Sequence, residues 1–411
     1  MITNAPFYRL RRIALPVLVA AAAALLLVGC DHQTGIFASL ERESEILNRN
    51  LPDNVSVAGV ARAGEHYFAA VGSVWVVSGS LEEAETNWKR VDPPGGDDAG
   101  WIALSLAGME DTLYAAFQDA DATYRGVYSY TADTDDGEWS DDPVYDGDVA
   151  ELFAFDTDED GVHDTLVGVR GVTGEDVAPQ SYEVVFDLTG SPTVAGSDPE
   201  NDPLRLNAVV DATYHADDGE YWIITRDDLY KGPDPSTLAK QELTGNLEDL
   251  EGLEAAPPFA GLHYDEGDLF VTTRDGDLYR RLAGGGDTWE KVEITESGPL
   301  GKPVALPGVG DAEPQLYIPA LTTDDNGGGG YFVMAPDGES ASRPTDDPSY
   351  VSAEISTAAV TAFHLFPRTT EGPYELFALT ADTGLWSRTV DPDMDPDTDD
   401  GSGLSNVWRW E

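Results

Sequence analysis

A pattern of strand, polar turn and strand recurs along most of this chain and restricts the folds that the chain can adopt. GEYWIITRDDLYKG (219–232) and GDLFVTTRDGDLYRR (267–281) show an apolar run, a turn, and a second run in which Leu precedes an aromatic residue. The aromatic residues that mark the second run are Trp75, Tyr128, Tyr230, Tyr279 and Trp386, with Phe332 as a weaker member. SYEVVFDL, near Val184, supplies the second run of a further unit. Short apolar runs broken by turn residues indicate an all-β protein.

The spacing of the units predicts a β-propeller. From Trp75 to Trp386 the markers recur about every 52 residues, close to the length of a propeller blade. Another apolar run precedes each pair, as in WIALSLAGM and ELFAF, and an outer segment such as TWEKVEI often follows. A sheet that cannot bury both faces alone is covered by its neighbours in a ring. We therefore predict an all-β propeller over residues 55–411, most simply with seven four-stranded blades; six or eight blades and a β-sandwich are the alternatives.

The first residues of the chain are typical of an export signal. Arg9, Arg11 and Arg12 precede an apolar run from Ile13 to Val28. This run of about 16 residues is shorter than the roughly 20 that cross a bilayer, and its flanks are those of a signal peptide. We interpret residues 1–29 as a signal peptide.

The end of the apolar run, Leu27-Val28-Gly29-Cys30, resembles the lipobox of bacterial lipoproteins. The resemblance implies cleavage before Cys30 and attachment of a diacylglycerol group to its thiol, which would anchor the protein in the cell membrane or the outer membrane on its exported face. Cys30 is the only cysteine in 411 residues, so a lipidated chain has no disulfide. The alternative is an ordinary signal peptide followed by a chance cysteine.

The segment from 30 to 54 separates the signal from the strands. Its apolar residues recur near helical spacing and have charged residues between them. They are Ile36, Phe37, Leu40, Ile46 and Leu47. We expect a short amphipathic helix in a lipid-anchored tether; a helix that packs on the domain is an equal alternative.

The chain is strongly acidic, with 23 Lys and Arg against 77 Asp and Glu and a net charge of −54. Removal of residues 1–29, which include three arginines and no acidic residue, takes the charge to −57. Such a field repels phosphates and excludes nucleic-acid binding. We interpret it as a halophilic surface suited to a salty or alkaline medium; a surface shaped for one basic partner is the alternative. A 41% apolar composition argues against disorder.

Two sets of residues recur between units and mark a candidate ligand face. His215, His263 and His364 each fall near the end of a predicted first strand. Three imidazoles at one height around the channel would suit a transition metal, whereas the simpler interpretation is polar caps bonded to their neighbours. Arg226 and Arg274 begin equivalent turns in adjacent units. They are candidates for binding an anion, or for pairing with Asp227 and Asp275, which follow them.

The sequence shows no motif of catalysis: it has no Gly-x-Ser-x-Gly, no His-Glu-x-x-His, no phosphate loop and no dinucleotide fingerprint. AGGGDTWEKV (283–292) resembles the Asp-box turn of sialidase-like propellers, but Leu282 and Gly284 replace its Ser and Asp. We therefore expect a monomeric binding or scaffold module for a protein or glycan partner in the cell envelope. The alternative is a sialidase-like or lyase-like propeller enzyme that acts on envelope or extracellular glycans.

One acidic hairpin has the spacing of a calcium loop. Alternate carboxylates and a glycine that permits a sharp bend can direct oxygens at one ion. The proposed ligands are Asp156, Asp158, Asp160, the carbonyl of Val162, and Asp164. The spacing resembles the loops of EF-hands and, because it joins two strands, those of FG-GAP-type propeller repeats; Val167 replaces the last EF-hand glutamate. We expect structural calcium here; a solvated acidic turn is the alternative.

Overall fold

The structure is a computed structural model in which the chain divides into two compact units, Met1–Arg49 and Asn50–Glu411. It describes residues 51–52, 56–78, 87–96, 99–131, 137–157, 163–172, 181–195, 206–215, 218–234, 237–241, 258–265, 267–282, 289–295, 298–307, 314–321, 329–336, 338–345, 350, 354–367, 373–381, 383–391 and 408–411. The predicted signal peptide, Cys30 and nearly all of the predicted tether, including its expected helix, lie outside these residues.

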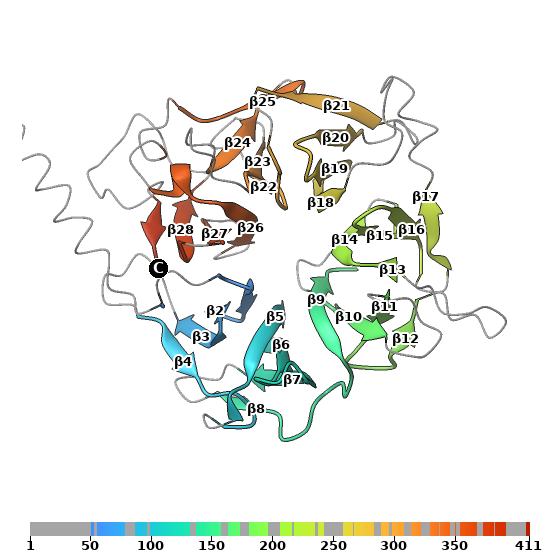
Figure 1. The fold of residues 1–411 in the computed structure, drawn as a ribbon, viewed down its shortest axis with the longest axis vertical. Coiled ribbons are helices and arrows are strands. Elements are labelled where there is room, and N and C mark those ends of the chain that lie inside the picture. The colour runs from blue at the N-terminus through green and yellow to red at the C-terminus, as the bar shows by residue number, and fades with distance from the viewer. Residues whose placement is uncertain are drawn as a thin grey trace, which may run out of the picture. The chain divides into compact units, whose positions relative to one another are not determined.

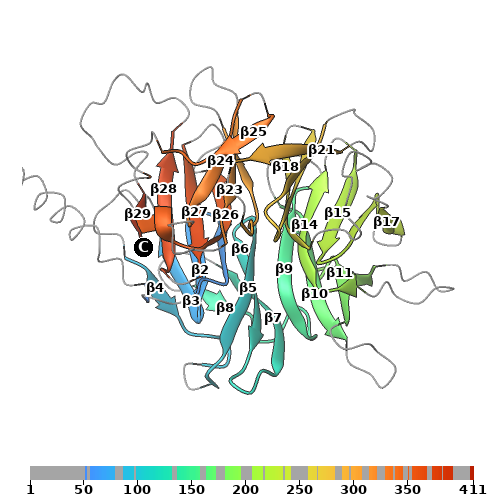
Figure 2. The same ribbon diagram turned by 45° about the horizontal axis from the view of Figure 1, so that its top comes forward.

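The second unit is a β-propeller, as the repeat predicts: antiparallel sheets follow one another around a ring (Figures 1 and 2). The first three sheets contain β1 (Gly59–Ala63), β2 (His66–Val71), β3 (Ser73–Ser78) and β4 (Lys89–Val91); β5 (Ile102–Met109), β6 (Thr112–Gln118), β7 (Tyr124–Thr131) and β8 (Glu138–Trp139); and β9 (Val149–Phe155), β10 (Thr165–Val172), β11 (Ser181–Phe186) and β12 (Thr193–Val194), with β13 (Leu206–Asn207) beside β11.

The remaining strands complete the ring. They are β14 (Val209–His215), β15 (Glu220–Thr225), β16 (Leu229–Gly232) and β17 (Ala239–Gln241); β18 (Phe259–Asp265), β19 (Asp268–Thr273), β20 (Leu278–Arg281) and β21 (Trp289–Ile294); β22 (Val304–Leu306), β23 (Gln315–Pro319), β24 (Tyr331–Met334) and β25 (Ser340–Ser342); and β26 (Val360–Pro367), β27 (Tyr374–Thr380), β28 (Leu385–Val390) and β29 (Arg409–Trp410). The helical element described is a short 3-10 turn, Glu354–Thr357. Within the described ranges, no helix is long and apolar enough to cross a bilayer.

The sheets do not separate cleanly into the seven four-stranded blades that the repeat predicts. Five sheets are separate, but β18–β21 and β22–β25 form one sheet of eight strands. The join is a parallel pairing in which Glu293 and Ile294 of β21 lie opposite Ser340 and Ala341 of β25. The physical reason is that β21 extends past its antiparallel partner β20, which leaves its last residues free to pair with the neighbouring edge strand. From here on, a run means a set of four consecutive strands, such as β1–β4. The eight-stranded sheet contains two runs, β18–β21 and β22–β25.

The repeated aromatic markers occupy the third strand of their runs. Trp75 lies in β3, Tyr128 in β7 and Trp386 in β28, and the strand before each marker pairs with it in antiparallel register. The hydrophobic core is distributed between neighbouring runs. Phe68 of β2, for example, packs edge-on against Tyr130 of β7 with ring centroids 5.8 Å apart. Each run thus covers the next, which is why a strand pair that is apolar on both faces repeats along the chain.

The ring closes between the first run and the last. Tyr67 of β2 and Phe377 of β27 pack with their ring centroids 5.3 Å apart. At the outer side, the Trp88 indole donates a hydrogen bond to the Glu411 carboxylate at 3.1 Å. These contacts join residues that are about 300 positions apart in sequence, so the closure depends on both ends of the repeat.

First strands lie nearest the middle of the ring (Figure 1), and some of them approach closely. A Cβ atom on Gly108 of β5 would lie 1.7 Å from the carbonyl oxygen of Arg62 in β1. A Cβ on Gly261 of β18 would lie 2.4 Å from the Cα of Lys302. Neither space admits a side chain, so glycine sets the distance between these strands.

Candidate functional site

The first strands of five runs contain a β-bulge at the same position, and the residues next to these bulges form the candidate site. Where each first strand pairs with the second strand of its run, the register shifts by one residue at the same point in five runs. The residues just after this shift are Ser105, Glu151, Asp211, Gly261 and Ala362. Such bulges redirect side chains. Polar residues that are far apart in sequence therefore reach one level of the ring.

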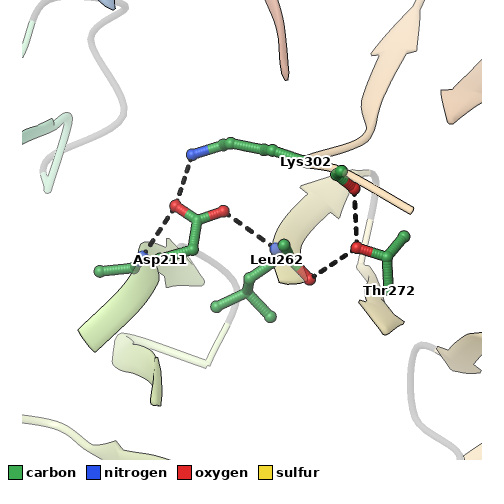
Figure 3. Close-up of polar contacts among 7 residues, drawn as sticks. Asp211, Leu262, Thr272 and Lys302 are labelled. Atoms are coloured by element: carbon green, nitrogen blue, oxygen red, sulfur yellow. Dashed lines mark hydrogen bonds and ion pairs between the residues drawn. The ribbon is translucent and has the colours of Figure 1, made fainter. Parts of the chain in front are cut away.

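Lys302 belongs to the same level, just before β22. It forms a parallel bridge with Ala362 of β26 and lies against Gly261 of β18. Its ammonium group makes an ion pair of 2.6 Å with Asp211 (Figure 3). The Asp211 side chain is only 3% exposed, whereas that of Lys302 is 31% exposed. An ion pair that is buried on one side requires further hydrogen bonds to offset the loss of water.

A backbone amide of the neighbouring run supplies such a bond, and a second hydrogen bond holds the residue before Lys302. The amide of Leu262 in β18 donates to Asp211 Oδ2 at 2.9 Å (Figure 3). Thr272 of β19 donates its hydroxyl to the carbonyl of Gly301 at 2.7 Å. A similar bond from a first-strand amide to a side chain of the preceding run occurs elsewhere in the ring. The amide of Leu152 in β9 donates to Ser105 Oγ at 3.1 Å. These polar contacts join one four-stranded run to the next.

Glu151, at the same level, is an unusually weak carboxylic acid. Desolvation, and next the negative charge of Asp211, raise its pKa from 4.5 to about 8, while Lys302 acts in the opposite direction. The side chain retains some accessible surface although protein atoms surround it closely. Near neutral pH Glu151 therefore holds its proton and is a hydrogen-bond donor rather than an anion.

Two of the three predicted histidines join this group. His263 of β18 and His364 of β26 lie at equivalent positions, two residues after the register shift. Desolvation, and then the charge of Lys302, lower the pKa of each to about 3. The amide of Ala305 donates to His263 Nε2 at 2.9 Å, which also favours the neutral ring. We name Glu151, Asp211, His263, Lys302 and His364 the axial cluster, since first strands of different runs bring them to Lys302.

The third histidine lies elsewhere. His215 is the last residue of β14, two positions further along its strand than His263 and His364 are along theirs. Its Nδ1 accepts a hydrogen bond from the amide of Asp218 at 3.2 Å, and its ring packs 4.1 Å from that of Tyr264. The three imidazoles thus do not share one height. In the described part of the chain, no group of three or more His, Cys, Asp or Glu residues is placed to hold a metal ion.

The two predicted arginines lie at the opposite ends of the first and second strands from His215. Arg226 follows β15 and Arg274 follows β19, and both side chains are exposed. The hydroxyls of Thr225 and Thr273 cap the turns that these arginines begin, accepting amide hydrogen bonds of 2.9 Å from Asp228 and Asp277. The two turns therefore share a threonine cap and occupy the same place in their runs, as the sequence pattern predicts, although Gly276 makes the second turn one residue longer.

The acidic hairpin is described only at its two ends. It joins β9 to β10, as predicted, with Asp164 donating its amide to the carbonyl of Phe155 at 2.8 Å. The Asp164 carboxylate accepts the hydroxyl of Thr157 at 2.8 and 2.9 Å, which closes the base of the hairpin. Asp158, Asp160 and Val162 lie outside the described residues, so the calcium site stays a prediction.

Sequence reasoning missed three members of the axial cluster. Glu151, Asp211 and Lys302 are single charged residues inside or beside apolar first strands, as in VAELFAF and AVVDATYH. A charge in a run that is otherwise apolar was the available signal, because burial of an unpaired charge is costly. The number of acidic residues hid it: 77 Asp and Glu give no reason to select two.

The sequence comparisons concern the first part of the chain. Residues 3–154 match the model of the TP013X lipoprotein family. The matched range includes the lipobox and the strands from β1 to most of β9. No curated protein sequence matches the chain. The family match and the fold together support a propeller lipoprotein.

The structural comparisons concern the fold. A structure of YCF48 bound to D1 peptide superposes with a TM-score of 0.51 and 10% identity, over 83% of this chain and 95% of that chain. The crystal structure of an ancestral GH74 enzyme superposes with a TM-score of 0.54 and 12% identity, over 84% of this chain and 49% of that chain. This chain thus spans about half the length of that enzyme. At such identities the likeness extends to the fold alone.

Proposed function

We propose that the protein is a lipid-anchored cell-envelope propeller that acts as a binding or scaffold module for a protein or glycan partner. The proposal rests on one observation: the polar side chains at the centre of the ring are hydrogen-bonded to neighbouring runs. Asp211 bonds Leu262 and Lys302, Ser105 bonds Leu152, and His263 bonds Ala305. Because these side chains hold neighbouring runs together, recognition is left to the loops and outer surfaces.

The described surface favours a polar or charged partner over an apolar one. Within the described residues, Ile102, at 38%, is the one large hydrophobic side chain that is exposed. Protein-binding surfaces that rely on the hydrophobic effect present a contiguous apolar patch. The acidic composition fits a surface adapted to salt that recognises its partner through hydrogen bonds and charge.

Lipid attachment to Cys30 is the part of this proposal that a single substitution tests. Cys30→Ala should leave unprocessed precursor that takes up no labelled fatty acid, whereas the wild-type protein should be labelled and sediment with membranes. Normal processing and membrane attachment of the Cys30→Ala protein would contradict the anchor. Separation of inner from outer membranes in the same experiment identifies the membrane.

We further propose that the hairpin from Asp156 to Asp164 binds calcium in a structural role. The hairpin's base is fixed by Thr157 and Asp164, and an ion would offset the repulsion among its carboxylates. Calorimetric titration of the full-length protein in detergent should show saturable uptake that Asp158→Ala plus Asp160→Ala abolishes. Equal uptake by the two proteins, or none by the wild type, would leave an ordinary acidic turn.

One observation favours the second candidate function, an enzyme acting on glycans. Burial raises the pKa of Glu151 to about 8, and Asp211, at the same level of the ring, forms an ion pair with Lys302. Two carboxyl groups in different protonation states are the usual acid and base of glycoside hydrolysis. Asp211, however, is 3% exposed and already bonded to Lys302 and Leu262. Hydrolysis of envelope glycans that disappears in Glu151→Gln would establish this alternative.

A further inference from the structure

Arg226 and Arg274 differ from every other arginine that the structure describes. Neither side chain has an ion pair, hydrogen bond, ring contact or other electrostatic interaction with a described residue. Each of the others takes part in at least one. They are Arg62, Arg90, Arg125, Arg170, Arg280, Arg281, Arg343, Arg388 and Arg409. In a chain with more than three acidic residues for each basic one, two exposed guanidinium groups that have no partner among the described residues require an explanation.

The backbone places these two arginines close together. The carbonyl of Arg226 accepts the amide of Phe259 at 2.9 Å, and the amide of Arg274 donates to the carbonyl of Pro258 at 2.8 Å. Pro258 and Phe259 share one planar peptide unit, whose oxygen and nitrogen are about 2.3 Å apart. The Arg226 oxygen and the Arg274 nitrogen are therefore at most about 8 Å apart. Two arginine side chains that begin this close can reach one ligand.

The nearby carboxylates do not neutralise the two arginines. Lys240 pairs with Asp228 at 2.5 Å, and Lys291 pairs with Asp277 at 2.6 Å, in the same two turns. Asp227 and Asp275 are exposed and directly follow the arginines, yet they form no ion pair with them. The interpretation that each arginine pairs with its adjacent aspartate is thus wrong for this structure. These two lysines thus pair with aspartates of the turns, whereas Arg226 and Arg274 are exposed and pair with no residue in the described ranges.

We propose that Arg226 and Arg274 form an anion-binding fork that takes one carboxylate or phosphate group of a small ligand. Two guanidinium groups offer planar pairs of N–H donors, which match the two oxygens of such a group. The net charge of −54 repels a polyanion strongly but a single oxyanion only weakly, so we expect a ligand with one anionic group. This inference deepens the proposed binding function by naming a recognition site on the face that carries these turns.

Calorimetric titration of the full-length protein in detergent, with inorganic phosphate in one arm and glucuronate in the other, tests the fork. We expect saturable uptake of about one anion per protein in at least one arm, and the stronger arm identifies the chemical group. Arg226→Gln plus Arg274→Gln should weaken uptake at least about tenfold, since two charge-assisted contacts are lost. Because both side chains are exposed and bond no side chain or backbone group that the structure describes, these substitutions should leave the thermal midpoint unchanged.

A matched control distinguishes loss of the binding site from a mere change in net charge. Lys89→Gln plus Arg90→Gln removes the same charge from exposed positions of β4 and should leave uptake within about twofold. No saturable uptake of either anion by the wild type, or equal weakening by the control pair, would overturn the fork. If the wild type captures an envelope partner but takes up neither anion, only the fork is contradicted. If the wild type takes up an anion but captures no partner, only the binding module is contradicted.

Discussion

At the scale of the residue, burial determines the chemistry of the axial cluster. The same desolvation that raises the pKa of Glu151 to about 8 lowers the pKa values of His263 and His364 to about 3. In each case the neutral form is favoured, because a charge at the centre of the ring has little contact with water. Asp211 and Lys302 lie 2.6 Å apart at the same level, so each has a partner of opposite charge.

This cluster predicts how stability depends on pH. Glu151 binds its proton more tightly in the folded state than in the unfolded state, where its pKa is near 4.5. Its contribution is therefore complete below pH 4.5 and is lost as the pH rises to about 8. Glu151→Gln mimics the protonated form and avoids the loss. We expect the variant's melting temperature to exceed that of the wild type by a margin that grows from pH 4.5 to pH 8, reaching about 3 °C or more.

The measurement is a series of thermal melts between pH 4 and pH 9 for the two proteins. Glu290→Gln, at an exposed position of β21, is the control and should run parallel to the wild type. A constant difference between Glu151→Gln and wild type at every pH would mean that Glu151 titrates as it does in the unfolded chain. The two histidines act in the other direction, because their lowered pKa values make stability fall as the pH drops from 6.5 towards 3.

At the scale of the element, close contact between first strands sets the geometry of the ring. Gly108 of β5 lies against the Arg62 carbonyl of β1, where an added Cβ would overlap the oxygen at 1.7 Å. Gly108→Ala should therefore force these strands apart and lower the free energy of unfolding by about 2 kcal/mol or more. Gly171→Ala, in β10, is the matched control, because nothing lies within 4 Å of its new Cβ. Chemical denaturation of both variants decides the point; equal midpoints would refute the close packing.

The strands could be predicted from the sequence, but the strand pairing that links neighbouring runs into one sheet could not. Trp75, Tyr230 and Trp386 mark third strands because an apolar pair with a fixed turn repeats, and that signal is local. The parallel pairing of β21 with β25 has no such signal, since the paired residues, such as Glu293 and Ser340, are 47 positions apart in sequence (340 − 293). The axial cluster was equally hidden, because it depends on which residue follows a register shift in each run.

At the scale of the whole molecule, the charge of −54 on 411 residues predicts strong dependence on salt. Self-repulsion opposes the compact state, and added ions screen it within a Debye length of about 10 Å at 0.1 M. The melting temperature should rise by at least about 5 °C between 0.1 M and 2 M NaCl. A flat profile over that range would contradict the halophilic interpretation and favour an acidic surface made for one partner.

The central claim is that an anchored propeller binds an envelope partner through its surface while its polar centre holds the ring together. Quantitative cross-linking in the native envelope at native salt, followed by purification and identification of what is bound, tests it most directly. We expect a reproducible protein or glycan partner, captured equally by wild type and by Glu151→Gln. The claim is contradicted if no partner is captured, or if Glu151→Gln abolishes capture while remaining folded, because the centre of the ring would then be the site of function.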